Sequence, residues 1–126
     1  MSILSSKYYE RRTHVVPAAH PRLNGTVITA DTQLQLVVHE YLVHDAPIHG
    51  HTWVMTHGTS FNKDLWQAII DDLLVRSNIR SATRRIFAVD AVNHGDSAIL
   101  NKSRLTQRET SYKSFNTSTA ANQSLA

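Results

Sequence analysis

The sequence predicts an α/β fold, because two apolar strand-like segments flank a segment with helical periodicity. The strand-like segments are residues 52–56 and residues 85–90, and the second is too continuously apolar for a sheet with one wet face. Between them, apolar residues recur at helical spacing over residues 61–74. A strand, a helix and a strand in this order form a right-handed βαβ unit, which builds a parallel sheet.

The residues before this unit predict further strands. Residues 33–43 alternate apolar and polar side chains, which is typical of a strand with one buried face. Two shorter β-branched segments, 13–17 and 25–29, precede that strand, and we expect them to form a hairpin-like element. Pro47 and Gly50 then mark the loop that leads into the βαβ unit.

The predicted helix has the clearest periodicity in the chain. Ser60 or Asn62 can serve as its N-cap, and Asp64 would place a carboxylate in the first turn, where the helix dipole favours negative charge. Arg76 marks its end. The apolar residues that share one face are Phe61, Leu65, Trp66, Ile69, Ile70, Leu73 and Leu74.

Length and composition describe a single globular domain followed by a polar tail. The 126 residues are 41% hydrophobic and 18% charged, close to the norm for proteins that bury a core. From Thr106 onward, Ser, Thr, Asn and Gln dominate and no period continues. We expect an N-terminal segment over residues 1–12, a folded region over 13–105, and a disordered tail over 106–126.

Composition also excludes several classes of protein and site. The absence of cysteine excludes disulfides, thiolate metal sites and a cysteine nucleophile. No apolar run approaches the ~20 residues of a membrane span, and the N-terminus lacks the apolar stretch of a secretory signal. The net charge of +3 comes from a weak basic excess in the second half without an aromatic platform, so we predict no nucleic-acid partner.

Two histidine–glycine motifs follow the two strands of the predicted βαβ unit. They lie in residues 53–66 (WVMTHGTSFNKDLW) and 86–97 (IFAVDAVNHGDS), and together they resemble the N-terminal part of the α/β-hydrolases of the AB hydrolase-1 type. Residues 13–17 (THVVP) and 98–102 (AILNK) extend the resemblance to a fungal group of peroxisomal lipase-like and host-selective toxin biosynthesis proteins. The resemblance covers about residues 13 to 105.

The resemblance implies that the loop after residues 52–56 contributes to an oxyanion hole. His57 and Gly58 are then the family's His-Gly pair, and the backbone N–H of Thr59 is the first candidate donor, with Ser60 as its neighbour. The second motif is expected to be a turn that shapes the floor of the site; it comprises His94, Gly95, Asp96 and Ser97.

The sequence lacks the groups that perform acyl transfer in the resembling family. There, a nucleophilic serine lies in a G-x-S-x-G turn, whereas glycines occur here only at positions 25, 50, 58 and 95. The same spacing excludes dinucleotide-binding and P-loop motifs. No histidine follows Ser97, so the triad base is missing as well. We therefore assign no catalytic residue and expect a truncated, inactive relative of enzymes that hydrolyse small-molecule ester, lipid or other acyl substrates.

Each candidate residue also has a structural interpretation. His57 can hold the end of its strand by hydrogen bonds rather than transfer protons. Ser60 and Ser97 are interpreted as a helix cap and a turn residue, and neither has an assured base. Asp90 and Asp96 are expected to bond local backbone rather than act as catalytic carboxylates.

Metal binding is a weaker interpretation of the eight histidines. His44, His49, His51 and His57 lie close together in the sequence but match no compact zinc motif, so we predict no metal and no cofactor.

The resemblance also predicts an exposed sheet edge. In the family, the strand equivalent to residues 52–56 pairs with a later strand that has no counterpart here, so this strand would be an apolar edge that permits self-association. The alternative function is therefore a non-catalytic interaction module. Resembling proteins often end in a Ser-Lys-Leu type peroxisomal signal, but this sequence ends in Ser-Leu-Ala126, so we expect a cytoplasmic location by default.

Overall fold

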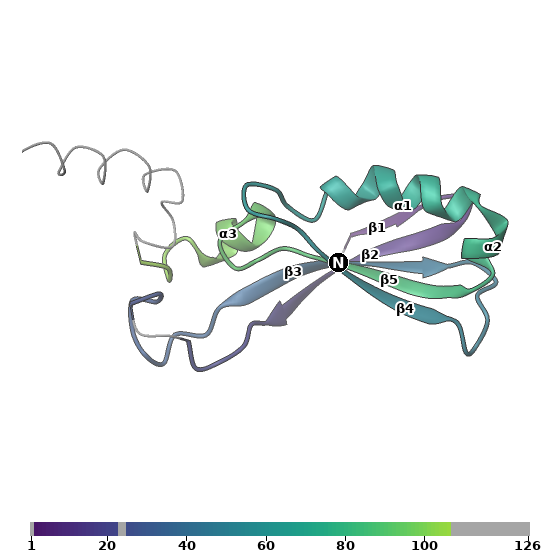
Figure 1. Ribbon diagram of the computed structural model, residues 1–126. Helices are drawn as coiled ribbons and strands as arrows, with labels where there is room; N and C mark the ends of the chain where they lie inside the picture. The colour runs from purple at the N-terminus through teal and green to yellow at the C-terminus, as the bar shows by residue number, and fades with distance from the viewer. Residues whose placement is uncertain (1, 23–24, 107–126) are drawn as a thin grey trace, which may run out of the picture.

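A computed structural model describes residues 2–22 and 25–106. These residues form a five-stranded sheet in the order β1-β2-β3-β5-β4, with α1 lying over one face and α3 beyond one end (Figure 1). The elements are β1 (Ile3–Ser5), β2 (Tyr9–Pro17), β3 (Gln35–Val43), β4 (His51–Thr56), α1 (Leu65–Val75), α2 (Ser77–Arg80), β5 (Thr83–Val89) and α3 (Gly95–Asn101).

The sheet contains the predicted βαβ unit. β4 and β5 pair in parallel, with Trp53 opposite Ile86, and α1 lies on the connection between them. The other neighbouring strands pair antiparallel: β1 with β2, β2 with β3, and β3 with β5. The α/β fold class is thus confirmed, together with the strand predicted over residues 33–43.

The N-terminal region differs from the prediction. β2 begins at Tyr9 and pairs with β3 along its whole length, from Tyr9 opposite Val43 to Pro17 opposite Gln35. Residues 25–29 form no strand, and Val27 alone makes an isolated bridge. The expected hairpin of residues 13–17 with 25–29 is therefore wrong, because β2 takes the longer β3 as its partner.

The start of α1 also differs from the prediction. The helix begins at Leu65 rather than Phe61, and Asp64 occupies the N-cap position without a side-chain cap hydrogen bond. Ser60 has a φ of 72°, and Asn62 accepts a hydrogen bond from the Asp64 N–H at 2.9 Å, so neither residue caps the helix as predicted. The preceding segment is irregular because its backbone is bonded to the second motif, as described below.

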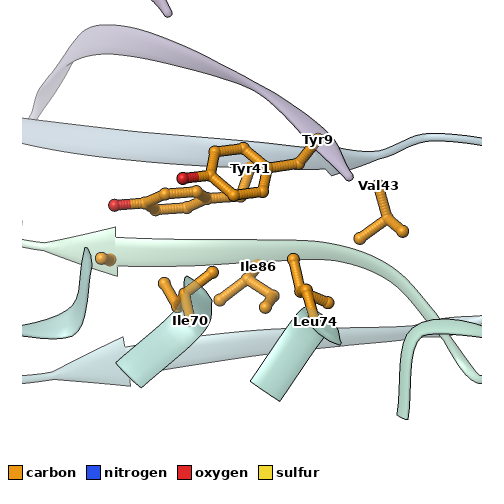
Figure 2. Close-up of a cluster of buried hydrophobic side chains, with 7 residues drawn as sticks. Tyr9, Tyr41, Val43, Ile70, Leu74 and Ile86 are labelled. Atoms are coloured by element: carbon orange, nitrogen blue, oxygen red, sulfur yellow. The ribbon is translucent and has the colours of Figure 1, made fainter. Parts of the chain in front are cut away.

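The main core fills the space between the sheet and α1 (Figure 2). Ile70 and Leu74 of α1 are fully buried against the strands. Tyr9 and Tyr41 pack edge to face, with ring centroids 5.1 Å apart. The Tyr9 hydroxyl donates to Asp71 Oδ1 at 2.6 Å, and burial together with this bond raises the pKa of Tyr9 to about 12. The helix is therefore fixed to the sheet by apolar and polar contacts alike.

β4 forms an edge of the sheet within the described residues. All its residues except Met55 are exposed, with Trp53 at 48% and Val54 at 66%. The strand contains no charged residue and no proline, which are common protections of a free edge. The exposed apolar edge that the sequence predicts is thus present in this part of the chain.

The predicted tail lies outside the described residues, except for Thr106. The Thr106 N–H donates to the Thr26 carbonyl at 3.3 Å, which ties the end of the described chain to the loop before β3.

Candidate functional site

The two histidine–glycine motifs meet where β4 and β5 end. Because these strands run in parallel, their carboxyl ends lie at one edge of the sheet, where open α/β sheets bind ligands. His57 directly follows β4, and His94 directly precedes α3. Their ring centroids are 5.0 Å apart. The structure therefore brings the two sequence motifs together at one place.

The two loops exchange hydrogen bonds through these histidines. The Ala91 N–H, after β5, donates to His57 Nε2 at 3.0 Å. In the opposite direction, the Ser60 N–H, after β4, donates to His94 Nε2 at 3.3 Å. Each imidazole thus accepts a backbone N–H of the other loop.

The two predicted oxyanion donors differ in what their backbone N–H groups contact. The Ser60 N–H is occupied by His94. The Thr59 N–H has no acceptor among residues 2–22 and 25–106. Thr59 and Gly58 are both exposed, and no atom within 4 Å would meet a side chain at Gly58. The geometry therefore leaves Thr59, and not Ser60, with a free donor in an open position.

A buried ion pair joins the same two loops below the histidines. Lys63, fully buried, donates from Nζ to Asp90 Oδ2 at 3.0 Å and to Asp96 Oδ2 at 2.6 Å. Asp90, also fully buried, accepts the Lys63 backbone N–H at 2.8 Å and the Asp96 backbone N–H at 3.0 Å. One carboxylate thus fixes the loop before α1, the lysine side chain and the start of α3.

The electrostatics of this cluster favour the charged forms of its members. Burial by itself would lower the pKa of Lys63, but the hydrogen bonds to Asp96 and Asp90 outweigh burial, so the pKa is raised. The hydrogen bond from Lys63 in turn lowers the pKa of Asp96. Neighbouring His39 is affected in the opposite sense: burial and the charge of Lys63 lower its pKa to about 4. At neutral pH the cluster therefore holds a charged lysine beside a neutral histidine.

The second motif begins a helix rather than forming only a turn. α3 starts at Gly95, and Asp96 and Ser97 lie in its first turn, so the turn predicted from sequence is wrong beyond His94. Gly95 has a φ of +51°, and a Cβ there would lie 2.5 Å from Asp90 Oδ2. Glycine is required here both by the backbone conformation and by the close approach of the carboxylate.

Ser97 anchors α3 and is not positioned as a nucleophile. It is fully buried, and its Oγ accepts the Val37 N–H of β3 at 2.8 Å. Asn101, also fully buried, accepts the Gln35 N–H at 2.9 Å and donates to the Gln35 carbonyl at 2.7 Å. These bonds attach α3 to β3 along its length, which agrees with the structural interpretation of Ser97.

An apolar cavity of about 290 Å³ lies beside the edge strand. Trp53 of β4 is half-exposed and lines this cavity. Its walls come from β4, β5 and the helices α1 and α2: Trp53, Met55, Leu73, Ile79, Thr83 and Ile86.

No metal centre is found in the described part of the chain. Among residues 2–22 and 25–106, no group of three histidine, aspartate or glutamate side chains is arranged to hold an ion. Within the same residues, no helix is long and apolar enough to cross a membrane.

Comparison with known proteins identifies a solved structure with the same arrangement of elements. The solved structure of the peroxisomal α/β-hydrolase Lpx1 from Saccharomyces cerevisiae superposes with a TM-score of 0.67 and 25% identity, covering 79% of this chain and 28% of Lpx1. The described part of the chain has the fold of part of an α/β-hydrolase. No protein-family model matches the chain.

Two curated relatives agree with the structural match. The peroxisomal membrane protein Lpx1 of Saccharomyces cerevisiae is 26% identical over 103 residues, covering 77% of this chain and 27% of the relative. The type I acyl-CoA thioesterase mpaH of Penicillium roqueforti is 27% identical over 106 residues, covering 81% of this chain and 24% of the relative. The chain thus spans only 24–27% of the length of these relatives.

Sequence reasoning missed the most buried charged residue of the site. Lys63 lies in an otherwise polar run, which gives no indication that its side chain is fully covered. Asp90 and Asp96 were expected to bond local backbone, and each also binds the Lys63 ammonium group. The one available signal was that Asp90 precedes the second motif and Asp96 lies within it, in a segment, residues 86–101, that contains no lysine or arginine.

Proposed function

We propose that this chain supplies the oxyanion-binding part of a serine-dependent hydrolase that acts on an ester, lipid or related acyl substrate. The observation that carries the proposal is the exposed Thr59 N–H, which has no acceptor among the described residues and follows the parallel strand β4. A backbone N–H without an internal acceptor at this edge of the sheet can stabilise the negative charge that develops on a carbonyl oxygen during acyl transfer.

The relatives support the acyl class of substrate. The protein from Penicillium roqueforti is named an acyl-CoA thioesterase, and thioester cleavage passes through the same kind of oxyanion as ester cleavage. Both curated relatives come from fungi, and we propose more narrowly a role in fungal toxin or secondary metabolism.

The oxyanion site can be tested without catalysis. In the isotope-labelled chain, we expect titration with butyrate, a carboxylate that mimics the acyl oxyanion, to shift the Thr59 amide resonance. The Ser60 amide serves as the internal control, because its N–H is already bonded to His94. A butyrate response confined to other residues, with Thr59 unchanged, contradicts the assignment of the donor.

The chain by itself is proposed to be inactive. The sequence contains no G-x-S-x-G segment, and Ser97, near the site, is buried and bonded to backbone. We expect no turnover of p-nitrophenyl esters and no serine labelled by a fluorophosphonate probe. Repeated turnover that stops when the probe labels one serine would overturn the inactivity.

The exposed edge favours a second candidate function, an interaction module that self-associates through β4. Val54 is 66% exposed on a strand without charged residues, so another edge can add to the sheet there. We expect light scattering to show a discrete oligomer that Val54→Lys dissociates. The matched control is Ile99→Lys, at a 74% exposed position on α3, which should leave the oligomer intact. A monomer, or polydisperse aggregate, rules out the module.

A further inference from the structure

We propose that His57 and His94 form a reciprocal clasp that positions the loop after β4, and that protonation of either imidazole opens it. The proposal deepens the proposed function and rests on it only in taking Thr59 as the oxyanion donor. The clasp itself is a property of the two loops and can be tested without a reaction.

The hydrogen bonds define the proton positions on both rings. A backbone N–H can only donate, so each Nε2 atom must carry a lone pair and no proton. The remaining proton of each neutral ring then lies on Nδ1. From there, His57 donates to the Gly58 carbonyl at 2.9 Å, and His94 donates to Asn93 Oδ1 at 2.7 Å. Both imidazoles are thus neutral with the same tautomer.

The clasp selects which backbone N–H is free. Ser60 adopts a φ of 72°, a left-handed conformation that is uncommon for a residue other than glycine. The bond to His94 Nε2 holds this conformation and uses the Ser60 N–H, so the Thr59 N–H is the donor that stays available. The two histidines therefore act as positioning residues for Thr59 and need not touch a substrate.

Protonation removes both the acceptor and the compatibility of the two rings. An imidazolium has protons on both nitrogens, so its Nε2 can no longer accept a hydrogen bond. Its Nε2–H would instead point at the backbone N–H that the neutral ring accepts. A second cation would then lie against the first, because the ring centroids are 5.0 Å apart. The clasp is therefore closed in the neutral state and opens when a ring is protonated, which for His94 requires a pH below the ordinary histidine range because burial and the neighbouring His57 lower its pKa.

The charged groups around the clasp are engaged with one another. From the end of β5, Asp90 attracts a proton to His94, but burial and the neighbouring His57 dominate and lower the pKa of His94. Asp90 is bonded to Lys63, and Asp96 on α3 is bonded to the same ammonium group. No carboxylate bonded to either imidazole is present among the described residues to retain an added proton.

The first test uses the unmodified chain and nitrogen NMR of its histidines. At pH 8, we expect His57 and His94 to show protonated Nδ1 and unprotonated Nε2. As pH falls from 8 to 5, the amide resonances of Ser60 and Ala91 should shift together with the protonation of these rings. The clasp is overturned if either ring carries its proton on Nε2 at pH 8. It is also overturned if the Ser60 and Ala91 amide resonances do not shift as the histidines become protonated.

The second test separates hydrogen-bond acceptance from titration. His94→Gln can supply a carbonyl acceptor that does not titrate, whereas His94→Leu supplies none. After correction for intrinsic exchange, we expect the Ser60 amide to exchange about tenfold faster at pH 5 than at pH 7.5 in the unmodified chain. His94→Gln should remove this pH dependence, and His94→Leu should show fast exchange at both pH values.

A matched control excludes a general effect of losing a histidine. His49 lies exposed in the loop before β4, so His49→Gln should retain the full pH dependence at Ser60. If His49→Gln removes that dependence, or if His94→Gln retains it, the clasp is wrong.

The clasp and the oxyanion function fail separately. If butyrate does not shift the Thr59 amide, while the Ser60 and Ala91 amides still shift with pH as expected, the proposed function is wrong and the clasp stands. If butyrate shifts Thr59 equally at pH 7.5 and pH 5.5 while the histidines are seen to protonate, the positioning role of the clasp is overturned.

Discussion

Asp90→Ala is expected to be the most damaging single substitution at the site. The Asp90 carboxylate is fully buried and accepts the Lys63 N–H at 2.8 Å, the Lys63 Nζ at 3.0 Å and the Asp96 N–H at 3.0 Å. After its removal, the buried ammonium group retains its close bond to Asp96 and a longer contact of 3.7 Å to Asp64. Two backbone donors also lose their acceptor.

The size of the effect follows from these losses. Removing one partner of a buried ion pair typically costs ~3–5 kcal/mol, and each buried donor left without an acceptor adds ~1–3 kcal/mol unless water reaches it. We therefore expect the free energy of unfolding to fall by about 4 kcal/mol or more, a large part of the ~5–15 kcal/mol typical of a domain. Asp90→Asn keeps an acceptor for the Lys63 N–H and should cost less.

Urea unfolding followed by circular dichroism measures this difference. The control is Asp72→Ala, which removes an exposed carboxylate that contacts Arg76 at 3.1 Å on the surface of α1. Exposed pairs of this kind contribute roughly 0.3–0.5 kcal/mol. If Asp90→Ala and Asp72→Ala destabilise the chain equally, the buried ion pair does not have the structural role assigned to it.

Three further predictions follow from glycine, histidine and isoleucine positions. Gly95→Ala should lower the free energy of unfolding by about 2 kcal/mol or more, because residue 95 has a φ of +51° and its new Cβ would lie 2.5 Å from a buried carboxylate. Gly58→Ala, where the new Cβ would meet no atom within 4 Å, should cost under about 1 kcal/mol. Equal urea midpoints for the two variants would refute this prediction. Because burial lowers the pKa of His39 to about 4, the unfolded state binds a proton at a higher pH than the folded state does, so the free energy of unfolding should fall by at most about 2.5 kcal/mol between pH 7.5 and 4.5. His39→Gln should reduce that loss. An unchanged dependence of stability on pH in His39→Gln would contradict this prediction. Ile70→Ala should lower the free energy of unfolding by ~2–5 kcal/mol, measured by urea unfolding, because Ile70 is fully buried. Ile69→Ala should cost clearly less, because the neighbouring Ile69 is 41% exposed. The reverse order would show that α1 presents a different face to the sheet.

The strands and the existence of α1 could be predicted from sequence because side-chain periodicity reports burial directly. Residues 33–43 alternate and residues 86–89, within the predicted strand 85–90, are continuously apolar, and both segments form strands close to those limits. The start of α1 could not be predicted in this way. The Lys63 N–H, which could have joined a helical turn, is instead bonded to Asp90, a residue distant in sequence.

The site was predicted in outline but not in its connections. The motif resemblance identified the loops of His57 and His94, yet a motif carries no information on which atoms exchange hydrogen bonds. The left-handed backbone at Ser60 accompanies a contact between the two loops, and that contact occupies the Ser60 N–H while the Thr59 N–H stays free. Such contacts become visible only when both strands are placed side by side.

The shared carboxylate of Asp90 has a consequence for engineering this fold. Because one side chain fastens both segments, a transplant of residues 57–64 into another scaffold would carry Lys63 without its counter-ion. The reverse transplant, residues 90–97 alone, would carry Asp90 without the amide and ammonium that it binds. The two peptides form a single exchangeable unit despite the helix and strand that separate them in the chain.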